Sequence, residues 1–441
     1  MIKKVKLKYN HFVVYLNKNE MFFWTFLNFG GSNFLRLASS LILTRIFLPE
    51  QFGLMAILVT LYVGVEQLSD VGIVASIIRH KDDKDAVFLK SAWTFSVIRG
   101  FILCIVLSLS SSFFANLFNA PIFQQYIPVF SLLFIIKGFK STSMVLHEKH
   151  KKIKILTKLE LSLQTITLIT ILILAKYFES LWVFIFGMLF SEILRTLSSY
   201  YILKGGVTGF LLDKVHVSNM IRFGKWLFLG TMFSFFATQG DRLLFGIYLT
   251  KEELGIYHVA ATFAALPVML HAALSSKIFF PTVCQKSESP QVEFKLVVNS
   301  LRKKIILLSL PVAFISAIFG QYIIALLYND NYQTAGKILQ ILSIGAILQI
   351  LGDSLWPILI AKGDSFRHMV FTAFRALVLI ASIVLGNYFF QFSGILIALA
   401  VTPFLSVILL TIMVRKYVKI DNILSSIVAF IAFFVLTLII I

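Results

Sequence analysis

Long runs of apolar residues alternate with short polar segments along the 441-residue chain. A helix that crosses roughly 30 Å of hydrocarbon needs about 20 mostly apolar residues, because each residue adds about 1.5 Å. The pattern therefore predicts an all-α polytopic membrane protein with thirteen membrane-spanning helices. These helices are expected over residues 22–47, 51–78, 91–113, 122–146, 155–175, 181–203, 220–247, 252–278, 302–322, 335–361, 366–388, 393–414 and 423–441.

Composition strengthens this prediction, because 58% of the residues are hydrophobic and only 14% are charged. Soluble domains contain about 45–50% apolar and about 25% charged residues, so a soluble globule is excluded. The formal charge of +19 comes from short basic clusters between apolar runs, which is not the continuous basic face of a nucleic-acid-binding protein. Cys104 and Cys284 form no disulfide or metal framework, and no Walker motif occurs. We expect no metal, cofactor or nucleic-acid partner.

The positions of lysine and arginine predict the orientation of the chain in the membrane. Loops after even-numbered spans are rich in both, as at Lys151 and Lys152, whereas loops after odd-numbered spans contain only Arg45, Lys176 and Lys251. Cytoplasmic loops retain basic residues, so the N-terminus is predicted to be cytoplasmic. Residues 1–20 are interpreted as a cytoplasmic amphipathic lead-in.

An internal repeat relates the two halves of the chain. Phe52-Gly53 opens the second predicted span and Leu254-Gly255 opens the eighth, at an offset of 202 residues. The same offset matches the polar residues Ser32, Arg36 and Ser39 with Ser234, Thr238 and Asp241. Duplicated bundles are common in transporters. The repeat predicts two pseudo-symmetric six-helix bundles, 21–205 and 206–415, around a central cavity, with 416–441 as an additional C-terminal transmembrane helix.

Ionisable residues occur within or at the edges of the predicted spans. Each would cost about 2.5–3.5 kcal/mol at the centre of a lipid-facing helix, so together they are expected to line an interior or a water-filled cavity. Asn33, Arg36 and Ser40 share one helical face, and Tyr62, Glu66 and Asp70 share another. The full set is Arg36, Glu66, Asp70, Arg99, Lys137, Lys140, Glu160, Glu192, Arg195, Asp241, Arg242, Lys337, Asp353 and Arg375.

Functional and structural interpretations of these charges are both open. Basic side chains in a cavity would attract a phosphorylated head group, and the candidate substrate-binding residues are Arg36, Arg99, Lys137, Lys140 and Arg375. Three carboxylates could instead couple protons or cations, namely Glu66, Asp70 and Asp353. The structural alternatives are a local ion pair between Glu192 and Arg195, a contact between Asp241 and Arg242 that stabilises a helix end, and snorkelling of the Lys337 side chain to the membrane surface.

Several motifs resemble one transporter family. Leu43 to Gly53, Asp70 to Ile73 with Arg79, and Arg99-Gly100 resemble the polysaccharide-synthesis (Wzx-type) flippases of the multidrug/oligosaccharidyl-lipid/polysaccharide exporter superfamily. Asp241 to Gly246, followed by Glu253 to Tyr257, is similar to the seventh and eighth helices of that family. The resemblance covers residues 20–415, and the order and spacing of the motifs are its most specific features.

The resemblance implies a non-enzymatic flippase with two six-helix bundles and alternating access. Its substrate would be oligosaccharide on an undecaprenyl diphosphate carrier, moved from the inner to the outer leaflet of the bacterial cytoplasmic membrane for O-antigen, capsule or exopolysaccharide synthesis. Polymerase and other polysaccharide assembly proteins would be partners. Arg36 matches a cavity-facing basic residue of the family's first helix, and Arg99 and Arg375 are weaker matches. The thirteenth span departs from the family's usual twelve or fourteen.

Two other functions are weighed against the flippase. A multidrug or cation antiporter of the same superfamily would favour a cavity dominated by carboxylates, whereas the set here has a modest positive excess, with eight basic and six acidic residues. An integral-membrane O-antigen polymerase or ligase resembles chains with a large external loop that holds the active site. The predicted external loops here are short, such as the one around Asn329 to Tyr332.

Overall fold

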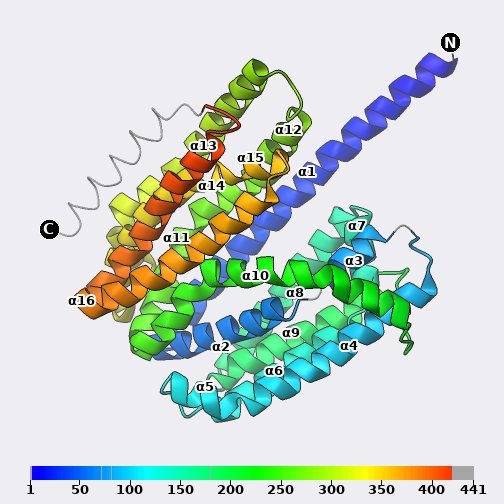
Figure 1. Ribbon diagram of the computed structural model, residues 1–441. Helices are drawn as coiled ribbons and strands as arrows, with labels where there is room; N and C mark the ends of the chain where they lie inside the picture. Colours follow the sequence, from blue (N-terminus) through cyan, green and yellow to red (C-terminus); the bar gives the residue numbers. More distant parts are fainter. Residues whose placement is uncertain (1, 71, 81, 179, 420–441) are drawn as a thin grey trace. The chain divides into compact units, whose positions relative to one another are not determined.

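The computed structural model describes residues 2–419 except residues 71, 81 and 179 (Figure 1). Helices joined by short turns make up this part of the chain, which contains no β-strand. Within it, eight helices or helix runs are long and apolar enough to cross a membrane, or nine if one bent pair counts as a span. The predicted all-α class is confirmed. Predicted span 423–441 lies outside the described residues, so the number of spans stays a prediction.

The chain divides into two compact units. Unit 1 comprises Met1–Ile46 and Ser69–Phe228, and unit 2 comprises Phe47–Leu68 and Leu229–Ile441. Helix α2 (Pro49–Leu68) thus belongs to unit 2, although it lies between two segments of unit 1 in the sequence. The predicted bundles 21–205 and 206–415 were defined from the sequence repeat, and their bounds differ from those of the two units. The bundles stay a prediction.

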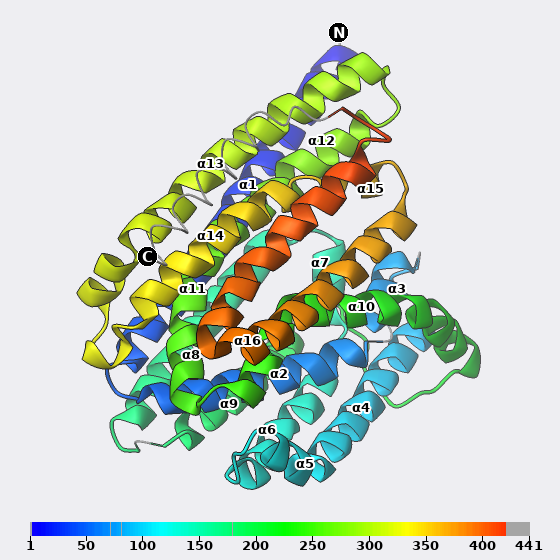
Figure 2. The ribbon, with the colours of Figure 1, turned by 60° about the vertical axis from the view of Figure 1, so that its left-hand side comes forward.

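Unit 1 is built around a series of packed helices (Figures 1 and 2). Helix α1 packs on α8, α8 on α9, α9 on α6, and α6 on α4. Among the short helices, α3 precedes α4, α5 follows α4, and α7 follows α6. The bounds are α1 Ile2–Leu43, α3 Ile73–Arg79, α4 Ala86–Leu109, α5 Ser111–Leu117, α6 Phe123–Gly138, α7 Ser143–Lys149, α8 Ile153–Ala175 and α9 Trp182–Tyr201, and α10 Lys214–Tyr248 begins in this unit.

Two predicted spans are interrupted, one where the chain passes from unit 2 to unit 1 and one within unit 1. Span 51–78 breaks between α2 and α3, where Gly72 adopts φ 70°, a left-handed conformation that glycine accepts readily. The Asp70 carboxylate accepts a hydrogen bond from the Gly72 N–H at 2.8 Å. The prediction that Asp70 continues the helical face of Glu66 is therefore wrong, because α2 ends at Leu68. Span 122–146 is likewise two helices, α6 and α7, bent by 64°.

Unit 2 packs α2 and α14 on α11, and α13 and α16 on α14. Within α16, Gln391 has φ 50° and ψ −134°, so the chain turns there. This turn separates the predicted spans 366–388 and 393–414. The bounds are α11 Lys251–Leu274, a π-helical turn Ser275–Phe279, α12 Phe280–Gln285, α13 Gln291–Leu327, a 3-10 turn Asp330–Tyr332, α14 Ala335–Asp353, α15 Trp356–Ala361 and α16 Ser365–Val414.

The two copies of the repeat motif touch each other where α2 crosses α11. A Cβ atom at Gly53 would lie 1.9 Å from the carbonyl oxygen of Lys251, and one at Gly255 would lie 1.8 Å from that of Pro49. Both pairs of equivalent residues differ by the repeat offset of 202. The contact is therefore symmetric under exchange of the copies, as in an isologous interface. Only glycine allows so close an approach, so the crossing supports the duplication inferred from the sequence.

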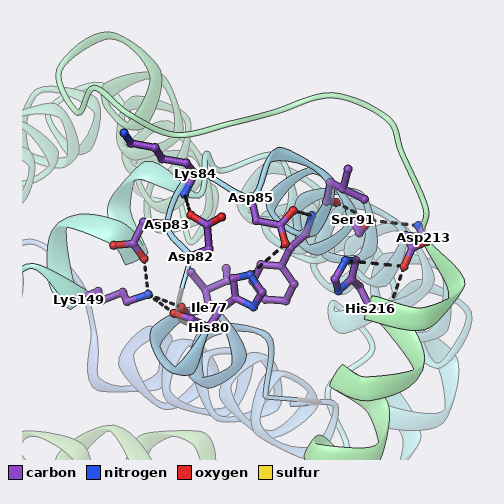
Figure 3. Close-up of polar contacts among 12 residues, drawn as sticks. Ile77, His80, Asp82, Asp83, Lys84, Asp85, Ser91, Lys149, Asp213 and His216 are labelled. Atoms are coloured by element: carbon purple, nitrogen blue, oxygen red, sulfur yellow. Dashed lines mark hydrogen bonds and ion pairs between the residues drawn. The ribbon is translucent and has the colours of Figure 1, made fainter.

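Connections that follow even-numbered predicted spans meet at one end of unit 1 (Figure 3). The Lys149 ammonium donates to the His80 carbonyl at 2.5 Å and also contacts Asp83. The rings of His80 and His216 lie edge to face with centroids 6.3 Å apart. The second, fourth and sixth spans thus end at a common side of the unit, as the predicted topology requires. That this side is cytoplasmic stays a prediction.

Candidate intramembrane charge sites

Arg99, on α4, stabilises the break between α2 and α3. Its Nε donates to the Ser69 carbonyl at 2.9 Å, and its Nη2 donates to the Ser69 hydroxyl at 2.8 Å. Ser69 directly follows α2, and the last carbonyls of a helix lack partners within that helix. Arg99 therefore has a structural contact in addition to any role in binding.

Arg36 is an exposed cation on an otherwise largely apolar stretch of α1. Its Nη2 donates to the Asn33 side-chain oxygen at 2.9 Å. The Asn33 amide in turn donates to the Phe29 carbonyl at 2.7 Å. The predicted shared face of Asn33 and Arg36 is confirmed by this contact. A guanidinium facing lipid would be costly, so the exposed side of Arg36 requires water or a polar ligand.

Four charged side chains form a network among α8, α9 and the connection that follows α6. Lys140 lies 3.7 Å from the Glu192 carboxylate, and Arg195 lies 3.7 Å from Glu192 and 3.0 Å from Glu160. Gln164 donates to Glu160 at 2.9 Å. The predicted pair of Glu192 and Arg195 is confirmed, although Glu160 is the closer partner of Arg195. Two cations and two carboxylates leave the network without net charge, which lowers the cost of placing them in the membrane.

The two contacts of Glu192, to Lys140 and to Arg195, are at ion-pair range rather than hydrogen-bond range. Within residues 2–419 as described, neither Glu192 Oε1 nor Arg195 Nε has a hydrogen-bond partner, and both atoms are buried. A buried polar atom normally has a partner. These two atoms therefore retain the capacity to bind water or a polar group, which distinguishes the network from a fully satisfied structural pair.

In unit 2, a predicted substrate-binding residue and a predicted coupling residue contact each other. Arg375 Nη1, on α16, lies 3.4 Å from Asp353 Oδ1 at the end of α14. The Gln349 amide donates to the other Asp353 oxygen at 3.1 Å. Both charged side chains are about four-fifths buried, with 18% and 20% exposure. Opposite charges attract each other across this contact, which joins α14 to α16.

The sequence interpretation missed Arg302, the most deeply buried cation among the described residues. It is 4% exposed, and its Nε donates to the Ser354 hydroxyl at 2.8 Å. Its position on α13 continues the buried stripe of Phe294 and Val298 at four-residue spacing. The next two residues, both lysines, are exposed. That spacing is the signal that would have separated Arg302 from its basic neighbours.

Asp241 and Arg242 each bind a different partner. The Tyr257 hydroxyl on α11 donates to the Asp241 carboxylate at 2.5 Å. Arg242 donates to the Gln239 side-chain oxygen at 2.7 Å, one turn back on α10. Asp241 thus joins two helices of unit 2. The contacts among the described residues do not pair Asp241 with Arg242, so the predicted pairing of these two residues at a helix end is not seen.

The predicted site residues fall in both units. Arg36, Arg99, Lys137 and Lys140 belong to unit 1, and Arg375 belongs to unit 2. Lys137 on α6 and Glu66 on α2 are half-buried. That the five cations share one cavity stays a prediction. Among the described residues, no group of three histidine, cysteine or acidic side chains is placed to hold a metal ion.

Comparison with known proteins identifies relatives in surface-polysaccharide synthesis. The chain is 24% identical over 396 residues to the lipopolysaccharide biosynthesis protein WzxC of Escherichia coli K12, covering 89% of this chain and 78% of that protein. It is 20% identical over 304 residues to the teichuronic acid biosynthesis protein TuaB of Bacillus subtilis 168, covering 67% of this chain and 61% of that protein.

Solved structures with the same fold include two kinds of transporter. The inward closed conformation of the lipid II flippase MurJ gives a TM-score of 0.73 at 14% identity, covering 94% of this chain and 90% of that one. An inward-facing MATE multidrug transporter gives 0.71 at 13% identity, covering 87% and 94%. At these identities the likeness shows the fold alone.

A family profile covers most of the described chain. The profile of the family described as polysaccharide biosynthesis protein matches residues 42–337, which is more than half of the sequence. The relatives and the fold agree with a transport protein rather than an enzyme. The chain belongs to this polysaccharide biosynthesis family, the Wzx-type flippases of the multidrug/oligosaccharidyl-lipid/polysaccharide exporter superfamily.

Proposed function

We propose that the chain moves polyprenyl-diphosphate-linked oligosaccharide from the inner to the outer leaflet of the bacterial cytoplasmic membrane. Membership of the polysaccharide biosynthesis family supports this function, as does similarity to a probable glycan biosynthesis flippase, Agl15 of Haloferax volcanii, at 28% identity over 144 residues, which cover 31% of this chain and 30% of Agl15. Undecaprenyl diphosphate is the proposed carrier, and a polysaccharide polymerase is a proposed partner.

The observation that carries the proposal is Arg36, an exposed arginine in a largely apolar stretch of α1. Arginine binds phosphate oxygens through charge-assisted, often bidentate hydrogen bonds. Arg36 is therefore assigned the diphosphate of the substrate, and Arg99, Lys137 and Lys140 of the same unit are assigned supporting roles. Arg375 is a weaker candidate, because Asp353 already engages it.

Alternating access gives the sugar head group a polar route while the polyprenyl tail stays in lipid. With a membrane potential that is negative inside, outward movement of two negative charges gains about 4–5 kcal/mol per 100 mV if both cross the full field. The potential is thus large enough to set the direction of transport. Glu66, Asp70 and Asp353 are the proposed candidates for ion coupling, and two of them have additional contacts: Asp70 accepts from Gly72, and Asp353 contacts Arg375.

Reconstitution of the purified full chain tests the class of substrate. Proteoliposomes would receive either fluorescent polyprenyl-diphosphate oligosaccharide or a cationic dye, with an imposed potential or a proton gradient. We expect the labelled glycolipid to change leaflet and to respond to the potential. Dye export driven by the proton gradient, without glycolipid movement, would instead indicate an antiporter.

A further inference from the structure

A hollow of about 370 Å³ lies at the end of unit 1 where the even-numbered connections meet. Polar side chains from two helices line it. Ser76, Arg79 and His80 come from α3 and the residue after it, and His216 and Asn219 come from the beginning of α10. These residues lie outside the set of intramembrane charges assigned to transport, so the hollow is a separate feature of the unit.

Packing and acidic partners hold the two imidazole rings at this hollow (Figure 3). The His80 ring stacks on Phe88 with centroids 3.9 Å apart and an 11° angle, and its Nε2 lies 3.1 Å from Asp85. The His216 ring meets Phe88 edge to face at 5.5 Å. Asp213 accepts from the His216 backbone N–H at 2.9 Å and so caps α10. The rings are thereby fixed before any ligand arrives.

The lining presents hydrogen-bond donors without a carboxylate. Arg79 is exposed and carries a permanent charge. The nearby acidic side chains are already engaged: Asp85 pairs with His80 and accepts from the Phe88 N–H at 3.0 Å, which lowers the pKa of Asp85. Asp213 lies 3.9 Å from His216 Nε2, and Asp83 contacts Lys149. A guanidinium, an amide, a hydroxyl and imidazoles together match the acceptor oxygens of a phosphate ester.

An exposed apolar segment directly precedes His216 of the lining in the sequence. It leads into the first turn of α10 and contacts α4, where the Phe210 ring lies 5.1 Å from that of Trp93. Large apolar side chains flanked by basic residues are typical of the interface between membrane and water. The exposed apolar residues are Phe210, Leu211, Leu212 and Val215, with exposures of 74%, 38%, 48% and 66%.

We propose that this hollow binds the phosphate group of an anionic phospholipid, with the acyl chains of the lipid beside the exposed apolar segment 210–215. The same lining could accept a free phosphate ester from solution, because the chemistry of the head group is shared. The apolar segment favours the lipid as the source. The inference stands independently of which glycolipid the protein transports.

Native mass spectrometry of the detergent-purified full chain tests the site. Dioleoylphosphatidylglycerol and dioleoylphosphatidylcholine would be added at equal concentration, and the lipid-bound fraction measured for each. We expect preferential retention of phosphatidylglycerol, and we expect Arg79→Ala to weaken it about tenfold, as loss of one charge-assisted hydrogen bond predicts. If Arg79→Ala fails to fold, Asn219→Leu takes its place in the test. It changes an exposed lining residue without altering charge, and it should also weaken the retention of phosphatidylglycerol.

A matched control and a competitor complete the test. Arg222→Ala removes an exposed cation from α10 that does not line the hollow, and it should leave the retention of phosphatidylglycerol unchanged. Displacement of the lipid by millimolar glycerol 1-phosphate would support the phosphate site, and it would identify a soluble phosphate ester as a ligand of that site. Equal retention of both lipids, or equal losses in Arg79→Ala and Arg222→Ala, would overturn the proposal.

Discussion

Units 1 and 2 accommodate intramembrane cations in different ways. In unit 2, Arg302 is buried against Ser354, and Arg375 is held by Asp353. In unit 1, Arg36 is exposed, and Arg195 belongs to a network in which buried polar atoms remain available. One kind of sequence signal, a basic residue within an apolar run, thus has two physical outcomes. Arg302 and Arg375 of unit 2 join helices through buried contacts, whereas Arg36 of unit 1 is exposed and bonds to Asn33, one turn back along its own helix.

The largest contrast is expected from glycines at helix contacts. Gly255→Ala would place a Cβ 1.8 Å from a backbone oxygen of Pro49, so α2 and α11 must separate. Gly31→Ala in unit 1 would place a Cβ 2.9 Å from the end of the Leu161 side chain, which can change rotamer. We expect Gly255→Ala to lower the free energy of unfolding by roughly 3 kcal/mol or more. Denaturation in mixed micelles measures both variants.

The matched variant sharpens that result. Gly31→Ala should change the unfolding free energy by no more than about 1 kcal/mol, because better helix propensity offsets the local rearrangement. Similar losses in the two variants would mean that the α2–α11 crossing is no tighter than the contact in unit 1.

Removal of a buried cation should cost more than removal of a half-exposed one. Arg302→Ala leaves a cavity and deletes the bond to Ser354, so we expect about 3 kcal/mol of destabilisation. Arg195→Ala disrupts contacts to Glu160 and Glu192 that retain access to solvent, and about 1 kcal/mol is expected. Thermal unfolding followed by size-exclusion chromatography ranks the variants. The reverse ranking would contradict the division between the units.

A double-mutant cycle measures the contact between α14 and α16. Arg375→Gln, Asp353→Asn and the combined variant should give a coupling energy of about 0.6 kcal/mol, typical of polar contacts in membranes. Additive effects would show that the two side chains act independently, and Arg375 would then regain its place among the substrate-binding candidates.

The smallest effect concerns pH at the end of unit 1. The hydrogen bond from Lys149 lowers the pKa of Asp83. A depressed pKa in the folded state contributes stability above the ordinary aspartate range, and that stability is lost as the pH falls through the folded value. We therefore expect a small difference between wild type and Asp83→Asn at pH 7 that vanishes in acid. Melting temperatures from pH 7 to pH 3 test this, and a difference that grows in acid would contradict it.

Local sequence predicted the helices well because apolar length is a local property. Helices α8 and α9 begin and end within two residues of the predicted spans 155–175 and 181–203. Interruptions were harder to foresee. The break before α3 depends on one glycine and one Asx contact, at Gly72 and Asp70, inside a segment that remains apolar on average. Hydropathy over a long window does not register such a turn.

Partners on different helices could not be read from the sequence. Glu192 and Arg195 were paired because they are three residues apart, but Glu160 is 35 residues from Arg195 and depends on the packing of α8 on α9. Asp241 likewise binds Tyr257 through helix packing. The charged residues within apolar runs could therefore be named from the sequence, apart from Arg302, while their contacts required the fold.

Transport by Arg36 variants tests most directly whether a cation of unit 1 binds the diphosphate. Leaflet exchange of fluorescent polyprenyl-diphosphate oligosaccharide would be measured in proteoliposomes containing equal amounts of folded wild type, Arg36→Lys and Arg36→Ala. We predict that Arg36→Ala loses at least about tenfold in rate and that Arg36→Lys retains part of it, since charge survives without the bidentate geometry. Exchange at the wild-type rate by correctly inserted Arg36→Ala would contradict the account.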